Sequence, residues 1–345
     1  MANVTLGQTG ITVERNGFGA LPIQRVSMAE ASAILRRAFA GGIRFYDTAR
    51  AYSDSEQKLG AVFGEPGMRE KIFLATKTHA KTPEEFWEHL ETSLRLLRTD
   101  YIDIYQFHQA TRCYRPGDGT GMYECMLQAK QQGKIRHIGL TAHLLPVARE
   151  CIDSGLYETL QFPLSYLSGP QELDLVQRCK DAGMGFIGMK ALAGGLINNS
   201  AAAYAFMAQF DHVVPIWGIQ RPHELEEFLS YVDYPVHMTP ELQAVIAHDQ
   251  KELAGDFCRG CGYCMPCPMG IEINQCARMS LLMRRAPFAG YLDEHWQKEM
   301  AKIETCLHCG QCAAKCPYQL DTPALLAKNY EDYRKILAGE VRVNG

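Results

Sequence analysis

Residues 43–63 read IRFYDTARAYSDSEQKLGAVF and place a short apolar run before an amphipathic stretch. The first part predicts a β-strand at Ile43–Thr48, and the apolar spacing of the second predicts a helix at Glu56–Phe63. The same order occurs eight times in all between residues 10 and 232. The other expected strands are Val13–Ala20, Ile72–Thr78, Tyr101–His108, Ile135–Thr141, Thr159–Leu164, Gly185–Lys190 and His212–Gly218. The other expected helices are Ala29–Ala40, Glu84–Leu97, Met122–Gln132, Pro146–Ser154, Gln171–Ala182, Ala201–Phe210 and His223–Tyr231.

Eight consecutive strand–helix units predict an α/β fold in which parallel strands close into a (β/α)8 TIM barrel. The alternative is a doubly wound open sheet, which usually has about five or six such units and a glycine-rich turn after its first strand. No G-x-G-x-x-G motif follows the first expected strand. The pattern therefore favours the closed barrel.

Eight of the thirteen cysteines lie in two tight runs near the C-terminus. The run at residues 306–317 is C-x2-C-x2-C-x3-C-P, the bacterial iron–sulfur spacing, and the run at residues 258–268 has two residues between its last two cysteines instead of three. In two-cluster ferredoxins the fourth cysteine of each run ligates the other cluster. We therefore expect two 4Fe–4S clusters. Their expected ligands are Cys258, Cys261, Cys264 and Cys316 for the first cluster, and Cys306, Cys309, Cys312 and Cys267 for the second.

Structural zinc and disulfides are the alternatives for these cysteines. Zinc sites favour two C-x2-C pairs separated by a loop, and disulfides between cysteines three residues apart would be strained.

The part of the chain around the cysteine runs shows helical patterns. Thr239-Pro240 opens an expected helix that Gly255 closes, and further helices are expected near Asn274–Arg285, at Leu292–Ile303 and from Thr322-Pro323 to Gly339. The chain is thus expected to divide into a barrel, residues 1–235, and a small all-helical two-cluster ferredoxin-like domain, residues 236–345.

Charge and hydropathy exclude several classes of partner. The net charge of −4 at pH 7 gives no electrostatic basis for binding nucleic acid or an anionic membrane. No apolar run approaches the ~20 residues of a membrane-spanning helix, and the first residues lack the basic and apolar regions of a signal peptide. A thiol-rich chain with oxygen-sensitive clusters fits the reducing cytoplasm.

Four polar residues lie at the ends of expected strands or in the loops after them. Asp47 ends the second strand, Lys77 the third and His108 the fourth, and Tyr52 follows Asp47 by five residues. In a barrel these positions converge at the catalytic face. A buried lysine lowers the pKa of a neighbouring tyrosine from about 10, so the phenol can protonate a carbonyl oxygen. Asp47 would keep Lys77 charged, and His108 would orient the carbonyl.

The same segments resemble the aldo/keto reductase family. The resemblance rests on Phe45-Tyr46-Asp47-Thr48-Ala49 with Tyr52, Ser55-Glu56-x-x-Leu59-Gly60, Thr76-Lys77, Asp100-Tyr101-Ile102-Asp103-Ile104-Tyr105 with His108, and Gly133-Lys134-Ile135-Arg136-x-Ile138-Gly139. It covers roughly residues 3–230, and residues 258–268 resemble the ferredoxin-like 4Fe–4S extension of one branch of the family. It implies a (β/α)8 barrel, hydride transfer between a nicotinamide and a carbonyl or alcohol, and catalytic roles for Asp47, Tyr52, Lys77 and His108.

The resemblance also implies a set of residues that bind the nicotinamide cofactor: Thr141, Gln161, Lys190, Gly218, Arg221 and Glu224. Thr141-Ala142 replaces the family's serine–asparagine pair, and the region after the eighth strand lacks its lysine–serine pair. Glu224 stands where the family has an arginine for the 2′-phosphate, which would favour NADH, whereas the nearby Arg221 could bind the phosphate of NADPH.

Three functions follow from the two halves together. The first is a carbonyl–alcohol oxidoreductase that uses NADH or NADPH, acts on a small molecule, and exchanges electrons through its clusters with a redox partner such as a ferredoxin or flavoprotein. The second is a conventional NAD(P)H carbonyl reductase with structural or redox-sensing clusters. The third is a non-enzymatic electron-transfer protein, against which the complete set of four catalytic residues argues.

Overall fold

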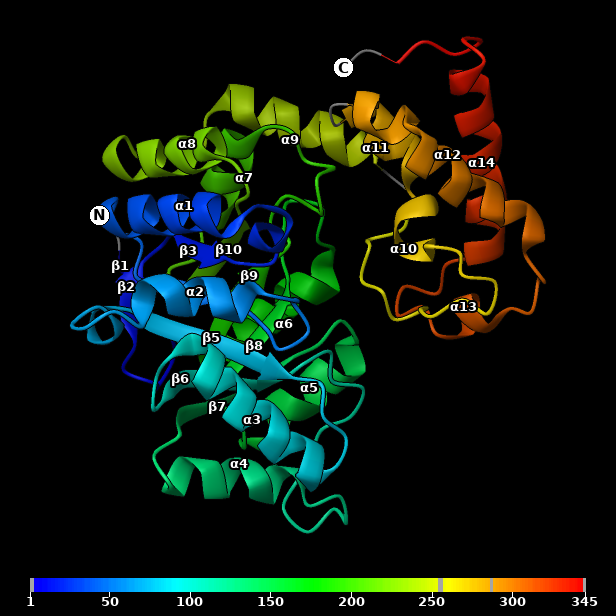
Figure 1. Ribbon diagram of the computed structural model, residues 1–345. Coiled ribbons are helices and arrows are strands. Elements are labelled where there is room, and N and C mark those ends of the chain that lie inside the picture. Colours follow the sequence, from blue (N-terminus) through cyan, green and yellow to red (C-terminus); the bar gives the residue numbers. More distant parts are fainter. Residues whose placement is uncertain (1–2, 254–256, 286–287, 344–345) are drawn as a thin grey trace. The chain divides into compact units, whose positions relative to one another are not determined.

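The computed structural model describes residues 3–253, 257–285 and 288–343. Eight parallel strands form a closed barrel in the order β10-β3-β4-β5-β6-β7-β8-β9 (Figure 1). The strands are β3 (Gly17–Gly19), β4 (Phe45–Asp47), β5 (Phe73–Thr78), β6 (Ile102–Phe107), β7 (Ile135–Thr141), β8 (Thr159–Pro163), β9 (Gly185–Met189) and β10 (Val213–Gly218). The predicted (β/α)8 barrel is confirmed, and the open sheet is excluded.

A helix follows each barrel strand. These helices are α1 (Met28–Ala40), α2 (Ser55–Phe63), α3 (Pro83–Leu97), α4 (Met122–Gln131), α5 (Leu145–Ser154), α6 (Pro170–Asp181), α7 (Ser200–Met207) and α8 (Pro222–Asp233). Gly60 explains how closely two of them approach, because a Cβ atom there would lie 2.0 Å from the Leu96 carbonyl oxygen. Any side chain at residue 60 would force α2 and α3 apart.

The first expected strand, Val13–Ala20, is wrong in its bounds. Its early part is β2 (Thr12–Glu14), which pairs antiparallel with β1 (Asn3–Thr5), and only β3 belongs to the barrel. The hairpin buries an apolar face against residues near the amino ends of the strands, including Phe45, Ile104 and Val214. Its contacting residues are Val4, Leu6, Ile11 and Val13. The hairpin thus covers the end of the barrel opposite the four residues that the sequence predicts to be catalytic.

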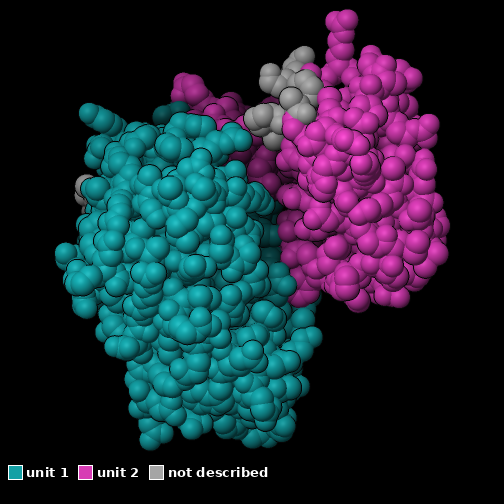
Figure 2. Space-filling view, viewed as in Figure 1, with its two compact units in different colours: residues 1–191, 201–239 teal, residues 192–200, 240–345 magenta. Residues whose placement is uncertain are grey.

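The chain divides into two compact units, residues 1–191 with 201–239 and residues 192–200 with 240–345 (Figure 2). The described part of the second unit contains helices and no strand. Its helices are α9 (Pro240–Glu252), α10 (Ile273–Cys276), α11 (Met279–Arg285), η3 (Phe288–Leu292), α12 (Glu294–Ala301), η4 (Lys302–Thr305), α13 (Gln311–Ala314) and α14 (Thr322–Leu337). Gly255, the expected end of α9, lies outside the described residues.

The helix expected near Asn274–Arg285 is broken into α10 and α11. The side chain of Asn329 on α14 reaches this break, where its Nδ2 donates to Ala277 O at 3.1 Å and its Oδ1 accepts from Ser280 N at 2.8 Å. These bonds satisfy a carbonyl at the end of one helix and an amide at the start of the next. A residue about fifty positions later therefore stabilises the interruption.

The second unit has its own apolar core. Met279, Met283 and Met300 are completely buried, and Tyr333 and Leu326 of α14 pack with them. Four partly buried cysteines of the two runs contact this core: Cys264, Cys267, Cys306 and Cys312. Over the whole chain, no described helix is long and apolar enough to cross a membrane.

Candidate functional site

Asp47 and Lys77 form a buried ion pair at the carboxyl ends of β4 and β5. Lys77 Nζ lies 2.6 Å from Asp47 Oδ2 and also donates to Thr48 O at 2.6 Å. Both side chains are almost completely buried. Burial raises the pKa of Asp47, and the charge of Lys77 opposes this effect. Two fixed acceptors therefore hold the lysine ammonium group at one point inside the strand ends.

Tyr52 and His108 lie beside this pair. The Tyr52 ring centroid is 5.0 Å from Lys77 Nζ and 5.7 Å from the His108 ring, with the two rings edge to face. The structure thus brings together all four of the residues that the sequence nominated as catalytic.

The protonation of Tyr52 differs from the expectation. Burial raises the pKa of Tyr52, and this effect outweighs the opposing charge of Lys77, so the net shift is upward. The neighbouring Lys77 alone predicts a lower pKa for Tyr52. The phenol is consequently protonated at neutral pH, as a proton donor must be.

His108 is neutral at physiological pH. Burial, assisted by the charges of Lys77 and His79, lowers the pKa of His108 to about 3. A neutral imidazole has one nitrogen that donates and one that accepts, so it can hydrogen-bond a carbonyl oxygen without introducing a charge.

Gln106 is a buried site residue that the sequence reasoning missed. Its Nε2 lies 2.9 Å from Gln161 Oε1 and 3.5 Å from Asp47 Oδ1, and Gln161 Nε2 lies 3.4 Å from Asp47 Oδ2. The two amides therefore solvate the Asp47 carboxylate below the site. A glutamine near the carboxyl end of the buried strand Ile102–Phe107 was the available signal.

Two of the expected cofactor residues, Thr141 and Gln161, are neighbours. They are register partners on β7 and β8, and both are buried. The Thr141 hydroxyl oxygen accepts a hydrogen bond from Gln109 N at 2.7 Å, which fixes the loop after β6. Its own proton can still be donated to a ligand.

Lys190, another expected cofactor residue, directly follows β9. Its backbone adopts a φ of 58°, a left-handed conformation that is costly for a residue with a side chain. Backbone strain of this kind is often found at functional sites.

Gly218, Arg221 and Glu224 lie at the end of β10 and the start of α8. Gly218 and Arg221 are exposed. Glu224 Oε2 accepts hydrogen bonds from the backbone amides of Gln220 at 2.8 Å and Arg221 at 2.9 Å. This carboxylate therefore caps α8, a role that sequence spacing did not reveal, and it occupies amides that could otherwise bind a phosphate.

The eight clustered cysteines line two small cavities in the second unit. One cavity is bordered by Cys258, Cys261, Cys264 and Cys316, and the other by Cys264, Cys267, Cys306, Cys309 and Cys312. Within the described ranges, no three His, Cys, Asp or Glu side chains converge closely enough for a single metal ion. Each cavity instead arranges four or more thiols around one space, which fits the donor set of a 4Fe–4S cluster.

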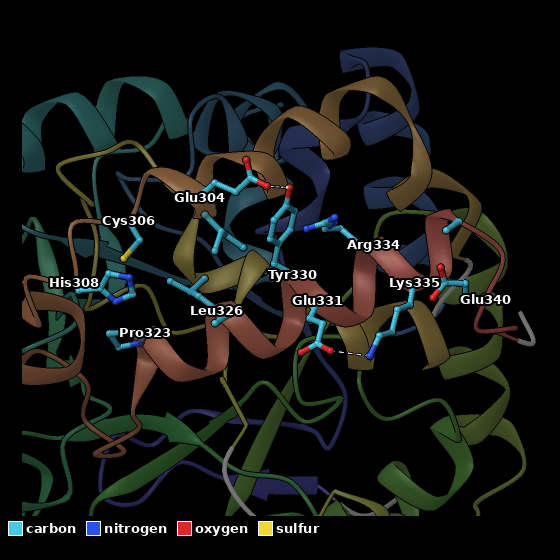
Figure 3. Close-up of a pocket in the computed structure, with 13 residues that line it drawn as sticks. Glu304, Cys306, His308, Pro323, Leu326, Tyr330, Glu331, Arg334, Lys335 and Glu340 are labelled. Atoms are coloured by element: carbon cyan, nitrogen blue, oxygen red, sulfur yellow. Dashed lines mark hydrogen bonds and ion pairs between the residues drawn. The ribbon is translucent and has the colours of Figure 1, made fainter.

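A third cavity, of about 610 Å³, lies beside Cys306 along α14 (Figure 3). Tyr330 lines it and donates a hydrogen bond to Glu304 Oε1 at 2.8 Å, and the Arg334 guanidinium lies 5.8 Å from the Tyr330 ring. Next to Cys306 the chain exposes Leu307, at 63 %, and Cys309.

A model described as the aldo/keto reductase family matches residues 15–207, more than half of the chain. The chain belongs to the aldo/keto reductase family. A second model, a 4Fe–4S dicluster domain, matches residues 257–321 of this aldo/keto reductase. The first match covers most of the barrel, and the second covers the helical part that contains the eight cysteines.

Individual relatives match part of this aldo/keto reductase. The uncharacterized oxidoreductase YrpG of Bacillus subtilis is 30% identical over 226 residues, covering 57% of this chain and 68% of that protein. The L-galactose dehydrogenase of Arabidopsis thaliana is 31% identical over 209 residues, covering 56% of this chain and 66% of that protein. The solved structure of aldo-keto reductase AKR11C1 from Bacillus halodurans has a TM-score of 0.63 at 23% identity and covers 72% of this chain and 96% of that one, a likeness of fold.

Proposed function

We propose that this protein interconverts a carbonyl compound and an alcohol by hydride transfer with NADH or NADPH. We further propose that it carries two 4Fe–4S clusters that exchange electrons with a redox partner. The observation that carries the first part is the buried Lys77–Asp47 pair beneath Tyr52, with His108 at its side. Tyr52, Lys77, Asp47 and His108 are the proposed catalytic set.

Proton transfer is assigned to Tyr52. In the direction of reduction, the carbonyl carbon accepts a hydride and the Tyr52 hydroxyl donates its proton to the carbonyl oxygen, which yields the alcohol. The charge of Lys77 stabilises the phenolate that remains until solvent reprotonates it. Because burial raises the pKa of Tyr52, its hydroxyl carries a proton at neutral pH and can act as the donor.

Neutral His108 would hold the carbonyl oxygen in place. Its ring lies edge to face with the Tyr52 ring, so one oxygen can meet both side chains. A hydrogen bond from the imidazole polarises the carbonyl and fixes the distance over which the Tyr52 proton moves.

We propose that the strand ends bind a nicotinamide cofactor. Bound nicotinamide supplies or accepts the hydride. We propose that Thr141, Gln161 and Lys190 contact its nicotinamide end, and that Gly218, Arg221 and Glu224 lie at its adenosine end. The support is the burial of the Thr141–Gln161 pair and the left-handed backbone of Lys190.

The cluster unit is proposed to transfer single electrons. Cys258, Cys261, Cys264 and Cys316 would hold one cluster, and Cys267, Cys306, Cys309 and Cys312 the other. The exposure of Leu307 and Cys309 supports the second cluster as the contact point for a ferredoxin or flavoprotein, because electron transfer requires close approach to a cluster edge.

A structural role for the clusters is the second candidate. The observation that favours it is the contact between four of the cysteines and the apolar core of the second unit. Clusters in that position would hold the helices together whether or not they change redox state.

The two candidates differ in how anaerobic protein responds to reductant. Under the proposed function, the protein oxidises NADH or NADPH when an aldehyde from a panel of candidates is supplied. The cluster absorption at about 400 nm also decreases when reduced ferredoxin is added. Hydride transfer without bleaching would support structural clusters. Failure to consume either nucleotide with any aldehyde would refute the catalytic assignment.

The cofactor preference depends on Glu224. A 2′-phosphate facing this carboxylate should lose about 1–3 kcal/mol, or about 10–100-fold in affinity, so NADH should bind at least as well as NADPH. Glu224→Gln should tighten NADPH binding about tenfold and leave NADH unchanged, because glutamine can still cap α8. Fluorescence titration with both nucleotides measures this effect.

Arg221→Ala is the matched control for that titration. Its side chain is exposed, and its removal should change the preference little. If the native protein bound NADPH tenfold more tightly, and Arg221→Ala abolished the difference, the preference would depend on Arg221 instead of Glu224.

The low pKa of His108 predicts the pH dependence. Its imidazole stays neutral from pH 5 to 8, so kcat/KM for an uncharged aldehyde should show no acid limb near pH 6.5 caused by His108. Between pH 6.5 and about 3, this histidine binds a proton in the unfolded chain but stays neutral in the folded one. The free energy of unfolding should therefore decrease as the pH falls through this range. An acid limb near 6.5 that disappears in His108→Gln would contradict the assignment.

A further inference from the structure

Two arginines of the second unit hold the chain segment 192–200. Arg278 lies just before α11 and Arg285 ends it, so they are about two helical turns apart. Arg278 Nη1 donates to Gly194 O at 3.1 Å, and Arg285 Nη1 donates to Leu196 O at 3.1 Å. Leu196 is completely buried. Although the segment connects barrel strand β9 to α7 in the sequence, it packs as part of the second unit.

Arg278 also packs against the loop that carries the first cysteine run. Gly260 lies between Cys258 and Cys261, and a Cβ atom there would be 2.9 Å from the Arg278 Cζ. The Gly260 N–H donates in turn to Cys258 Sγ at 3.4 Å. The guanidinium is therefore separated from a cluster ligand by a single glycine.

Neighbouring groups fix the guanidinium in this position. Gln275 Oε1 accepts from Arg278 Nη2 at 2.7 Å and from Nε at 3.2 Å, and the Arg278 side chain is largely buried. Arg285 has a different environment, because it forms ion pairs with Asp249 and Glu252. The two arginines share the task of holding segment 192–200, but only Arg278 contacts the cysteine loop through Gly260.

We propose that Arg278 is a positioning residue with two roles. Its fixed positive charge raises the reduction potential of the cluster held by Cys258, Cys261, Cys264 and Cys316. Its bond to Gly194 links that cluster to the segment that begins two residues after Lys190. This inference rests on the proposed function, because it requires both a cluster and a nicotinamide site.

The charge acts through the electron that reduction adds. Reduction places one electron on the cluster and breaks no bond to the thiolates, so the net charge of the cluster becomes more negative. A nearby buried cation stabilises that form, since the interaction is less screened inside the protein than in water. Loss of the cation should therefore shift the equilibrium toward the oxidised cluster.

The link to the nicotinamide site follows from chain continuity. Residue 192 follows Lys190 by only two residues. A change in the position or order of segment 192–200 on reduction of the first cluster would therefore alter the backbone at Lys190. Reduction of the cluster would then change the nucleotide affinity by some factor. By thermodynamic linkage, bound nucleotide must change the reduction equilibrium constant of the cluster by the same factor.

Potentiometric titration of the anaerobic full-length protein, followed by electron paramagnetic resonance, tests the first role. Arg278→Gln should lower the reduction equilibrium constant of one cluster about tenfold, which is about 59 mV for a one-electron couple. Arg278→Lys should retain most of the native potential because the charge remains. Arg285→Gln is the matched control, since it removes an arginine from the same segment without touching the Gly260 loop. In Arg285→Gln the reduction potential of the first cluster should remain native.

Nucleotide affinity tests the second role. Both Arg278→Gln and Arg285→Gln release segment 192–200, so both should change the NADH dissociation constant, by about fivefold. Unchanged affinity in both variants would remove the proposed link. If native protein bound no nucleotide at all, the proposed function would fail, and the potential of Arg278→Gln would still decide the electrostatic role.

Two outcomes of the potentiometry would overturn that electrostatic role: an unchanged potential in Arg278→Gln, or an equal shift in Arg285→Gln. Iron and sulfide analysis shows whether each variant keeps its clusters. If Arg278→Gln lost a cluster, Gln275→Leu would provide the test, because it keeps the charge but removes the oxygen that positions it. That variant should shift the potential in the same direction by a smaller amount, and a native potential would contradict the proposal.

Discussion

Replacing Tyr52 with phenylalanine should lower turnover of a good carbonyl substrate at least about 100-fold, the usual scale for a lost general acid. The change removes only the hydroxyl group, and the ring that packs against His108 and Lys77 remains. Nicotinamide binding should therefore stay near native. Steady-state turnover and a fluorescence titration of the nucleotide, both on anaerobic protein, separate the two effects.

Tyr123→Phe is the matched control for this experiment. It removes the Tyr123 hydroxyl, which donates to Leu156 O at 2.6 Å. Tyr123 lies on α4, outside the proposed catalytic set. Turnover should remain within about twofold of native, although the lost hydrogen bond costs about 1 kcal/mol of stability. Native turnover in Tyr52→Phe would show that another group supplies the proton.

Lys77→Met tests the charge beneath Tyr52 and should be similarly severe. It also leaves Asp47 buried without its cation, which costs about 3–5 kcal/mol. The double variant Asp47→Asn/Lys77→Met removes both charges and should recover much of the stability without recovering turnover. Recovery of turnover in the double variant would mean that Lys77 serves folding alone.

The barrel could be predicted because its signal is local and repeated. Each strand–helix unit, such as residues 43–63, shows its own change of apolar periodicity, so small errors in bounds do not change the topology. The N-terminal hairpin was missed because β2 and β3 are three residues each and are separated by only two residues. The expected strand Val13–Ala20 ran across both of them, although the polar residues Glu14, Arg15 and Asn16 stand where β2 ends.

Other features depended on distant partners and could not be read from local sequence. The break between α10 and α11 is stabilised by Asn329, and Gln106 acts only because Asp47 and Gln161 converge on it. The spacing predicted that Glu224 lies near α8. It did not predict that the carboxylate turns back to cap the helix. The predicted decrease in the pKa of Tyr52 was wrong for a related reason. The burial that raises this pKa depends on residues from the whole fold that surround the side chain.

Removing one cysteine of the second run should cost an entire cluster. Native protein should contain about eight iron and eight acid-labile sulfide atoms per chain after anaerobic purification, because the two cavities provide four thiolates for each cluster. Cys309→Ser should lower both counts to about four. Part of the helical structure of residues 257–343 should be lost as well, since the apolar core of this unit is small and contacts the cluster cysteines.

Cys276→Ala is the matched control, because Cys276 is buried in the same core but borders neither cysteine-lined cavity. It creates a cavity that costs about 1–2 kcal/mol, and it should retain about eight irons. Metal and sulfide analysis with circular dichroism distinguishes loss of a ligand from loss of packing. Stoichiometric zinc without sulfide in the native protein would show that these cysteines do not hold iron–sulfur clusters. Equal iron loss in both variants would show that packing, instead of the Cys309 thiolate, retains the second cluster.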